Sequence, residues 1–179
     1  MSAANAIRLR AMEPEDLDLL YRIENDLTLW DVGTTNVPYS RYTLHDYIAN
    51  ASGDIYVDKQ VRLIIELLDG QTIGIADIVN FDPKHQRAEL GLVIERPFRH
   101  RGYAQQSLVL LADYALHQLH LHQLYVCVAA NNEPALSLFN HAGYDNSIVL
   151  RDWLYDGSHY QDAIVMQRLL ANAVETPNK

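Results

Sequence analysis

The chain has 179 residues, of which 49% are apolar and 21% charged, as in ordinary globular proteins, and this length suits one domain with a single core. The formal net charge of −9 at pH 7 disfavours nucleic acid as a partner, because neutralising phosphates requires a basic face. The apolar runs are too short to cross a bilayer, so no membrane partner is expected. The single cysteine, Cys127, allows no intrachain disulfide and favours a cytoplasmic protein.

The first half of the chain predicts a strand, two helices and a hairpin. Residues 7–12 alternate between apolar and polar and predict the strand, and Pro14 then opens a helix with its apolar residues on one face. A second helix is expected over residues 40–51. Two apolar strands follow and flank Asp69-Gly70, a pair that suits the left-handed angles of a tight hairpin turn.

The second half predicts, in order, a strand, a long helix, a strand, a short helix and a closing hairpin: 85–95, 104–119, 124–130, 132–143 and 147–170. Asn132 is a natural N-cap for the short helix and Gly143 a natural C-terminal stop. The order β-α-α-β-β-β-α-β-α-β-β predicts one α/β (α+β) domain over residues 1–179, with a core at about 7–170 and a mixed sheet flanked by helices.

A turn rich in positive charge lies between the strand at 85–95 and the long helix. Arg96, Arg99, His100 and Arg101 precede Gly102 there. A strand that turns directly into a helix leaves the first helical amides unpaired, and these amides and the helix dipole favour an anion. Gly102 has no Cβ, so a phosphate can approach the backbone closely. The turn predicts a phosphate-binding corner without the spacing of a P-loop or a dinucleotide fingerprint, with a solvated basic turn as the alternative.

Two segments carry a family resemblance. RHRGYA (99–104) resembles the Q/R-x-x-G-x-G/A signature of the GNAT N-acetyltransferase superfamily, and NEPALSLFNHAGY (132–144) resembles the family's N-x-x-A-x-x-x-Y-x-x-x-G-F. The element order fits the family over about 7–170. The resemblance implies a GNAT-like mixed, splayed central β-sheet flanked by helices, and acetyl-CoA as the co-substrate. No metal is expected, because the histidines at 117–122 have no acidic or thiol ligand alongside.

The resemblance also implies which residues bind the coenzyme. Backbone amides of the turn would cradle its pyrophosphate, the edge of the 85–95 strand would pair with its pantetheine arm, and two residues of the short helix would line that arm. The expected residues are Leu92, Val93, Ile94, Arg99, His100, Arg101, Gly102, Tyr103, Ala104, Gln105, Asn132 and Phe139. A plain N-cap is an equally good interpretation of Asn132.

Acetyl transfer to an amine needs a base that removes a proton, and a carboxylate can act through a water. Glu89 is the candidate, because the family often carries an acid at this strand position. Alternation places Glu89 on one face of its strand with Arg87, so an exposed glutamate beside an arginine is the alternative. Asp77 and Asp82 are weaker candidates for the base.

The resemblance implies two further catalytic features. A strand amide near Val93 would polarise the thioester carbonyl. The tyrosine that usually protonates the leaving sulfur in the family is replaced by Phe139, which has no proton to give. A thiol with a pKa of about 8.5 can leave as the thiolate and take a proton from water afterwards. The acid is therefore in doubt, although the reaction is not.

The acceptor amine is suggested by the first helices, which usually line the acceptor site in this superfamily. Seven acids lie between residues 13 and 31 against one base, Arg22. Glu24, Asp26 and Asp31 are the expected substrate-binding residues, although acids in a first helical turn can simply serve the helix dipole. RAELGLVI (87–94) resembles the spermidine/spermine acetyltransferase branch, so a polyamine such as spermidine is expected.

Two other functions stay open. WLYDGSHYQDAIVMQ (153–167) is common to the polyamine branch and to the branch that acetylates ribosomal-protein N-termini, so a peptide N-terminus is the second candidate acceptor. The substitution at Phe139 leaves a third reading, a non-catalytic acetyl-CoA-binding module. The sequence does not decide between a monomer and a homo-oligomer.

Overall fold

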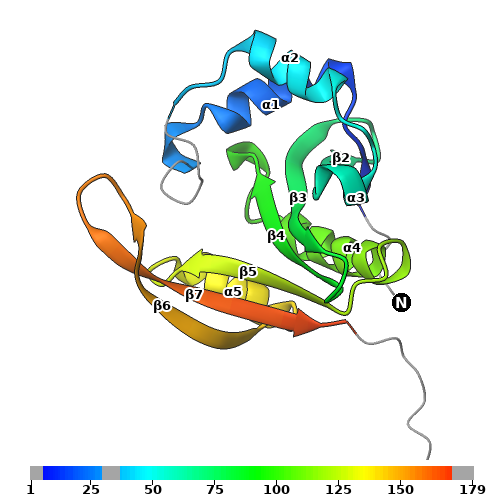
Figure 1. The fold of residues 1–179 in the computed structure, drawn as a ribbon. Helices are drawn as coiled ribbons and strands as arrows, with labels where there is room; N and C mark the ends of the chain where they lie inside the picture. Colours follow the sequence, from blue (N-terminus) through cyan, green and yellow to red (C-terminus); the bar gives the residue numbers. More distant parts are fainter. Residues whose placement is uncertain (1–5, 30–36, 171–179) are drawn as a thin grey trace, which may run out of the picture.

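The computed structural model describes residues 6–29 and 37–170, which form a seven-stranded sheet in the order β1-β2-β3-β4-β5-β7-β6 with helices on both faces (Figure 1). The strands are β1 (Ile7–Ala11), β2 (Val61–Leu67), β3 (Thr72–Asp82), β4 (Arg87–Ile94), β5 (Gln123–Ala129), β6 (Asp145–Tyr155) and β7 (Tyr160–Leu169). The helices are α1 (Leu17–Glu24), α2 (Arg41–Ala49), α3 (Ile55–Asp58), α4 (Tyr103–His117) and α5 (Glu133–His141), with 3-10 turns η1 (Pro14–Asp16), η2 (Leu27–Leu29) and η3 (Arg96–Phe98).

This order confirms the predicted fold class and every predicted strand and helix, and adds α3. The sequence did not predict α3, because four residues are too few to show a helical period. Its N-cap is Asp54, whose carboxylate accepts a hydrogen bond from the Tyr56 amide at 2.8 Å. It ends at Lys59, which has a left-handed φ of 57°.

The sheet consists of two antiparallel parts joined by a short parallel contact. Strands β1 to β4 form one part, and β5, β7 and β6 form the other. The parts meet where β4 pairs with β5 over three residue pairs, from Arg87 opposite Gln123 to Glu89 opposite Tyr125. Beyond the last pair the two strands diverge, as Figure 1 shows. The central sheet is therefore splayed, as predicted.

Each face of the sheet packs against its own pair of helices. Leu20 of α1 and Leu44 of α2 pack with Ile64 and Ile75 of the sheet on one face. On the other face, α4 and α5 cover a larger core that includes Leu111 of α4. We call these the α1/α2 face and the α4/α5 face.

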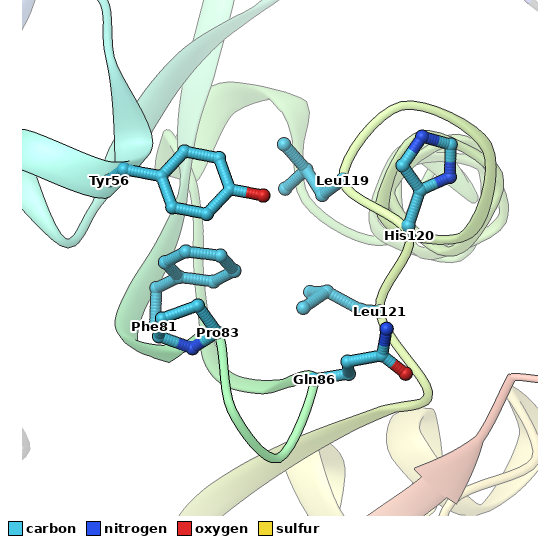
Figure 2. Close-up of a pocket in the computed structure, with 7 residues that line it drawn as sticks. All are labelled: Tyr56, Phe81, Pro83, Gln86, Leu119, His120 and Leu121. Atoms are coloured by element: carbon cyan, nitrogen blue, oxygen red, sulfur yellow. The ribbon is translucent and has the colours of Figure 1, made fainter.

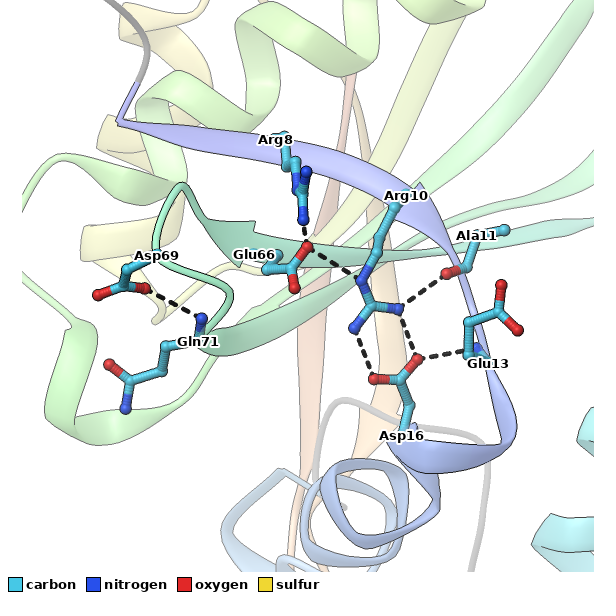
Figure 3. A network of polar contacts seen from close by, with 8 residues as sticks. All are labelled: Arg8, Arg10, Ala11, Glu13, Asp16, Glu66, Asp69 and Gln71. Carbon is cyan, nitrogen blue, oxygen red and sulfur yellow. Dashed lines mark hydrogen bonds and ion pairs between the residues drawn. The ribbon is translucent and has the colours of Figure 1, made fainter.

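A polar network fixes the start of α1 on the sheet (Figure 3). The Arg10 guanidinium donates two hydrogen bonds to the buried Asp16 carboxylate, at 2.7 and 2.8 Å, and Asp16 also accepts from the Glu13 amide. Glu66 of β2 accepts from both Arg8 and Arg10 of β1. Burial alone would raise the pKa of Asp16, but the bonds from Arg10 outweigh it and lower that pKa. The network ties β1, β2 and α1 together.

Candidate functional site

A gap opens between β4 and β5 where their pairing ends. Both strands continue beyond the Glu89–Tyr125 pair, and in the part of the chain that the structure describes no further pairing connects them. Val93 packs on the α1/α2 face, and alternation places Glu89 and Gly91 on that face too. From β5, Tyr125 and Cys127 share one face by the same rule. We call this gap the β4–β5 slot.

The strand register decides which amides face the slot. The Glu95 amide donates to the Ile73 carbonyl at 2.9 Å, so that pair is a hydrogen-bonded pair of the antiparallel ladder. Val93 lies opposite Ile75, two residues along the same ladder, so its backbone N–H and C=O groups also point toward β3. Consistent with this, a side chain at position 74 would collide with the Val93 carbonyl oxygen. Of the strand amides near Val93, those of residues 92 and 94 are therefore the ones directed into the slot.

The basic turn before α4 has the conformation of an anion site. Gly102 is the N-cap of α4 with φ of 81°, and His100 also has a left-handed φ of 60°. No atom lies within 4 Å of the place where a Cβ of Gly102 would be, so the space above it is open. Arg99 donates from Nε to the Ile94 carbonyl at 2.8 Å, which holds the turn against the end of β4. Arg101 is exposed, above the Phe98 ring.

The first turn of α4 completes this corner. Amides in the first turn of a helix have no partner within the helix, and here they belong to Tyr103, Ala104 and Gln105. Together with the positive end of the dipole of a fifteen-residue helix, they suit a diphosphate. The corner lies just after the last residue of β4, so a ligand bound there can extend along the slot. The residues present therefore fit coenzyme A.

The predicted coenzyme residues of α5 are at opposite ends of the helix. Asn132 accepts a hydrogen bond on Oδ1 from the Ala135 amide at 3.2 Å and is thus an N-cap. Phe139 is only 7% exposed and packs edge-on against Tyr144, with 5.2 Å between ring centroids. The Tyr144 hydroxyl is buried and has no hydrogen-bond partner among the described residues, and burial raises the pKa of Tyr144 to about 12.

Glu89 has a polar partner that the sequence did not predict. Asn80 donates from Nδ2 to Glu89 Oε2 at 2.7 Å. Asn80 lies in a bulge of β3 and has a left-handed φ of 52°. Asn80 and Glu89 both lie close enough to Tyr125 to influence its pKa. The pKa of Tyr125 is raised, first by burial and then by the negative charge of Glu89.

Neither Asn80 nor Tyr125 is among the residues that the sequence predicts for the site. Alternation along β5 would have found Tyr125 once its register against Glu89 was known. The expected neighbour of Glu89, Arg87, instead contacts Asp82 at 3.3 Å, and Asp82 also accepts hydrogen bonds from the backbone of the following turn.

A half-buried arginine holds two of the candidate carboxylates. Arg62 of β2 donates to both oxygens of Asp77, at 2.6 and 2.9 Å, and to Glu24 of α1 at 2.5 Å. Asp77 lies opposite Gly91, where a Cβ would touch the Asp77 side chain. Asp77 is thus committed to an ion pair, which weighs against it as the base. Burial would lower the pKa of Arg62, but the charges of Asp77 and Glu24 raise it.

The other expected acceptor residues are less exposed to a ligand than the sequence suggests. The Asp26 carboxylate accepts hydrogen bonds from Thr28, which lower its pKa, and lies 3.8 Å from Arg96. Asp31 lies outside the described residues. The acids of this region that have an arginine partner are Asp16, Asp18, Glu24 and Asp26. Arginines therefore offset part of the negative charge of this region.

A small pocket lies at the end of the sheet away from the phosphate corner (Figure 2). Tyr56 and Phe81 line one side of it and Leu119 and Leu121 the other, around about 40 Å³, room for little more than water. It lies beyond the C-terminal end of α4, about 22 Å from the phosphate corner at the rise of an α-helix.

Residues 6–29 and 37–170 contain neither a candidate metal site nor a candidate membrane-spanning helix. No three His, Cys, Asp or Glu side chains there could share a metal ion. No helix in those ranges is both long and apolar enough to cross a bilayer.

Comparison with known proteins places this geometry in a family. A profile described as an acetyltransferase (GNAT) domain matches residues 6–145. A spermidine N(1)-acetyltransferase of Escherichia coli (strain K12) is 26% identical over 167 residues, which cover 93% of this chain and 87% of the relative. The putative ribosomal N-acetyltransferase YdaF of Bacillus subtilis (strain 168) is 26% identical over 162 residues, 88% of each chain.

Solved structures share the fold. The spermidine N-acetyltransferase from Vibrio cholerae, in complex with CoA and spermine, superposes with a TM-score of 0.82 at 24% identity, over 92% of this chain and 96% of the other. The mixed fold agrees with this solved structure, and the predicted acetyl-CoA co-substrate agrees with the matching profile, which covers most of the chain. The chain belongs to the GNAT family of acetyltransferases.

Proposed function

We propose that the acceptor of this acetyltransferase is a polyamine such as spermidine, acetylated in the cytoplasm. Acetyl transfer from acetyl-CoA is supported by one observation: the β4–β5 slot lies next to the left-handed turn at Gly102. An extended coenzyme arm needs an open strand edge, and its diphosphate needs free amides next to that edge. Both are present in one continuous stretch of chain.

The coenzyme is held mainly by backbone in this proposal. The turn of residues 99–105 takes the diphosphate, and Arg101 adds charge from the surface. The edges of Leu92 and Ile94 pair with the pantetheine arm, and the Asn132 side chain reaches that arm while it caps α5. The buried ring of Phe139 forms part of the apolar floor on the α4/α5 face.

Glu89 is the proposed base. It lies at the closed end of the slot and takes a proton from the ammonium group through a water. The Leu92 amide, which faces the slot, donates a hydrogen bond to the thioester oxygen, and such a donor contributes about 3 kcal/mol to transition-state stabilisation. Asp77, held by Arg62 in two hydrogen bonds, is not part of this step.

The preference for a cationic acceptor has two supports. Asp77 lies beside Gly91 in the slot, and Arg62 joins it to Glu24, so two carboxylates gather around one guanidinium there. Curated relatives from Escherichia coli and Vibrio cholerae are spermidine N(1)-acetyltransferases, at 26% and 24% identity. Asp26 and Asp31 would hold the distal amines of the chain-like substrate. A dodecameric Vibrio cholerae relative also supports a homo-oligomer.

A peptide N-terminus is the second candidate, because YdaF has the same 26% identity to this chain as the Escherichia coli spermidine enzyme. Spermidine and a peptide N-terminus differ in the spacing of their positive charges. Thiol release from acetyl-CoA should be measured with spermidine, spermine and peptides that have free N-termini. Turnover with spermidine at saturating acetyl-CoA is the expected result, and turnover with peptides alone would replace the proposal by the second candidate.

The same measurement tests the third function, a module that binds without turnover. Calorimetry with CoA provides the control, since it reports binding independently of any acceptor. Tight CoA binding together with no thiol release from any amine would make the chain a binding module. Glu89→Gln tests the base: an unchanged kcat/KM across pH would remove Glu89 from the mechanism.

A further inference from the structure

Helix α5 supplies no hydroxyl for the leaving sulfur. Phe139 takes the place of the family's tyrosine, and its ring is buried on the α4/α5 face. Five residues on, Tyr144 has a hydroxyl, but that hydroxyl is enclosed by the core and exposes less than 1 Å². A group that lined an open slot would be accessible to water. Tyr144 is therefore not the missing proton donor.

Tyr125, unlike Tyr144, lies at the β4–β5 slot. It belongs to the last residue pair between β4 and β5, so its side chain marks the closed end of the slot. It is half-buried and shares the α1/α2 side of the slot with Glu89, its partner in the register. The proposed base and a phenol thus lie side by side where the strands part.

Asn80 connects these two groups. Its side-chain amide donates to the Glu89 carboxylate at 2.7 Å and lies near Tyr125, and it belongs to a third strand. The bulge in β3 that turns Asn80 toward them requires a left-handed φ of 52°. Such conformations cost energy and are retained where a site depends on them.

We propose that Tyr125 donates the proton that the departing sulfur of coenzyme A takes up, and that Asn80 positions Tyr125 relative to Glu89. This inference rests on the proposed function, with Glu89 as the base. It explains how the chain can work with a phenylalanine at position 139.

Each proton in the step has a source and a destination. Glu89 takes one proton from the ammonium group through a water, and the amine nitrogen forms a bond to the thioester carbon. As the carbon–sulfur bond breaks, Tyr125 gives its hydroxyl proton to the sulfur. The phenolate then takes the surplus proton from the nitrogen, which restores Tyr125. Glu89 releases its proton to water, and the products are the amide and the free thiol.

The surroundings of Tyr125 suit an acid. Its pKa is raised, because burial and the charge of Glu89 disfavour the phenolate, while Arg87 and Asn80 act in the opposite direction. Cys127, two residues along β5, is the other titratable neighbour on this face. The hydroxyl is therefore protonated at neutral pH, as a proton donor must be.

The decisive variant is Tyr125→Phe. Loss of the hydroxyl should lower kcat for spermidine about 100-fold, the usual contribution of an acid, without changing CoA affinity in calorimetry. Tyr114→Phe, which removes a half-buried hydroxyl of α4, is the matched control and should keep wild-type kcat.

Asn80→Gly tests positioning without disturbing the backbone, because glycine accepts the left-handed angle readily. It should lower kcat and leave the KM for acetyl-CoA unchanged. A second readout needs no turnover: the thiol of bound CoA, titrated by NMR of its neighbouring carbon, should ionise at lower pH in the wild type than in Tyr125→Phe. The reason is that a hydrogen bond from Tyr125 stabilises the thiolate.

Two results would overturn this inference. One is wild-type kcat in Tyr125→Phe, and the other is an identical thiol titration in both proteins. Failure of the proposed function would give a different result, because the wild type would then release no thiol with any amine. The titration of bound CoA would still report whether Tyr125 contacts the sulfur.

Discussion

Arg10 and Asp16 form a two-bond ion pair, at 2.7 and 2.8 Å, between the first strand and the turn that begins α1. Asp16 is 4% exposed, so loss of its charge leaves the guanidinium without its main partner. Asp16→Asn should lower the free energy of unfolding by about 2 kcal/mol, measured by urea denaturation. Asp18→Asn is the control, because the Asp18–Arg41 pair is exposed and should contribute nothing measurable. Equal losses in both variants would contradict this account.

The same pair makes stability depend on pH. The pKa of Asp16 is lower in the folded chain than its ordinary value of about 4, so its contribution is complete above that pH and disappears as the pH falls through the lowered pKa. Glu66, whose pKa the Arg8 hydrogen bond lowers, acts with the same sign. The stability difference between wild type and Asp16→Asn should therefore shrink between pH 5 and acid pH, about where carboxylates titrate. A constant difference across that range would refute the linkage.

Tyr144→Phe should stabilise the fold. The mutation removes a buried hydroxyl that has no partner among the described residues, and leaving such a group unpaired costs about 1 kcal/mol. Tyr47→Phe provides the opposite case, since the Tyr47 hydroxyl accepts a hydrogen bond from Gln60 at 3.3 Å, and its loss should destabilise. In thermal unfolding, the midpoint should rise for Tyr144→Phe and fall for Tyr47→Phe. A lower midpoint for Tyr144→Phe would show that its hydroxyl is satisfied.

Gly102→Ala separates backbone strain from ligand binding. Gly102 has φ of 81° and Gly157, in the β6–β7 turn, has φ of 96°, and neither position has an atom within 4 Å of an added Cβ. Alanine at either site should cost about 1 kcal/mol of stability, because the left-handed angle is unfavourable with a side chain. Only Gly102→Ala should weaken CoA binding, by about tenfold in calorimetry. If both variants bind CoA alike, the turn is not the diphosphate site.

Cys127 offers a chemical probe of the slot. Burial and the charge of Glu89 raise the pKa of its thiol, so alkylation by iodoacetamide near neutral pH should be slower than that of free cysteine. Glu89→Gln should speed the reaction, and CoA should slow it by covering β5. Intact mass measures the rate directly, because the chain has one cysteine. Equal rates with and without CoA would place Cys127 outside the ligand's reach.

The sequence predicts the order of elements well because each long element carries its own signal. The hairpin at Asp69-Gly70 and the glycine at position 102 are visible from turn chemistry alone. Gly70 and Gly102 both have left-handed angles, with φ of 94° and 81°, whereas Asp69 does not. The four-residue helix α3 lacks such a signal. Its only cue is a capping aspartate, Asp54, which many loops also contain.

The polar contacts of the site are less predictable, because they depend on register. Arg62 and Glu24 are 38 residues apart and meet only when α1 packs across β2. Asn80 reaches Glu89 through a bulge that shifts the β3–β4 register, a feature set by tertiary contacts. Counting acids near the first helices therefore overstated the free negative charge, since it could not show which arginine each carboxylate meets.

The divergence of β4 from β5 leaves two strand edges in the middle of the sheet without ladder partners, a condition that invites pairing with other chains. A coenzyme lying along these edges would act as an extra strand and shield them. Storage without ligand should thus promote self-association of this protein, and added CoA should suppress it, quite apart from any gain in catalysis.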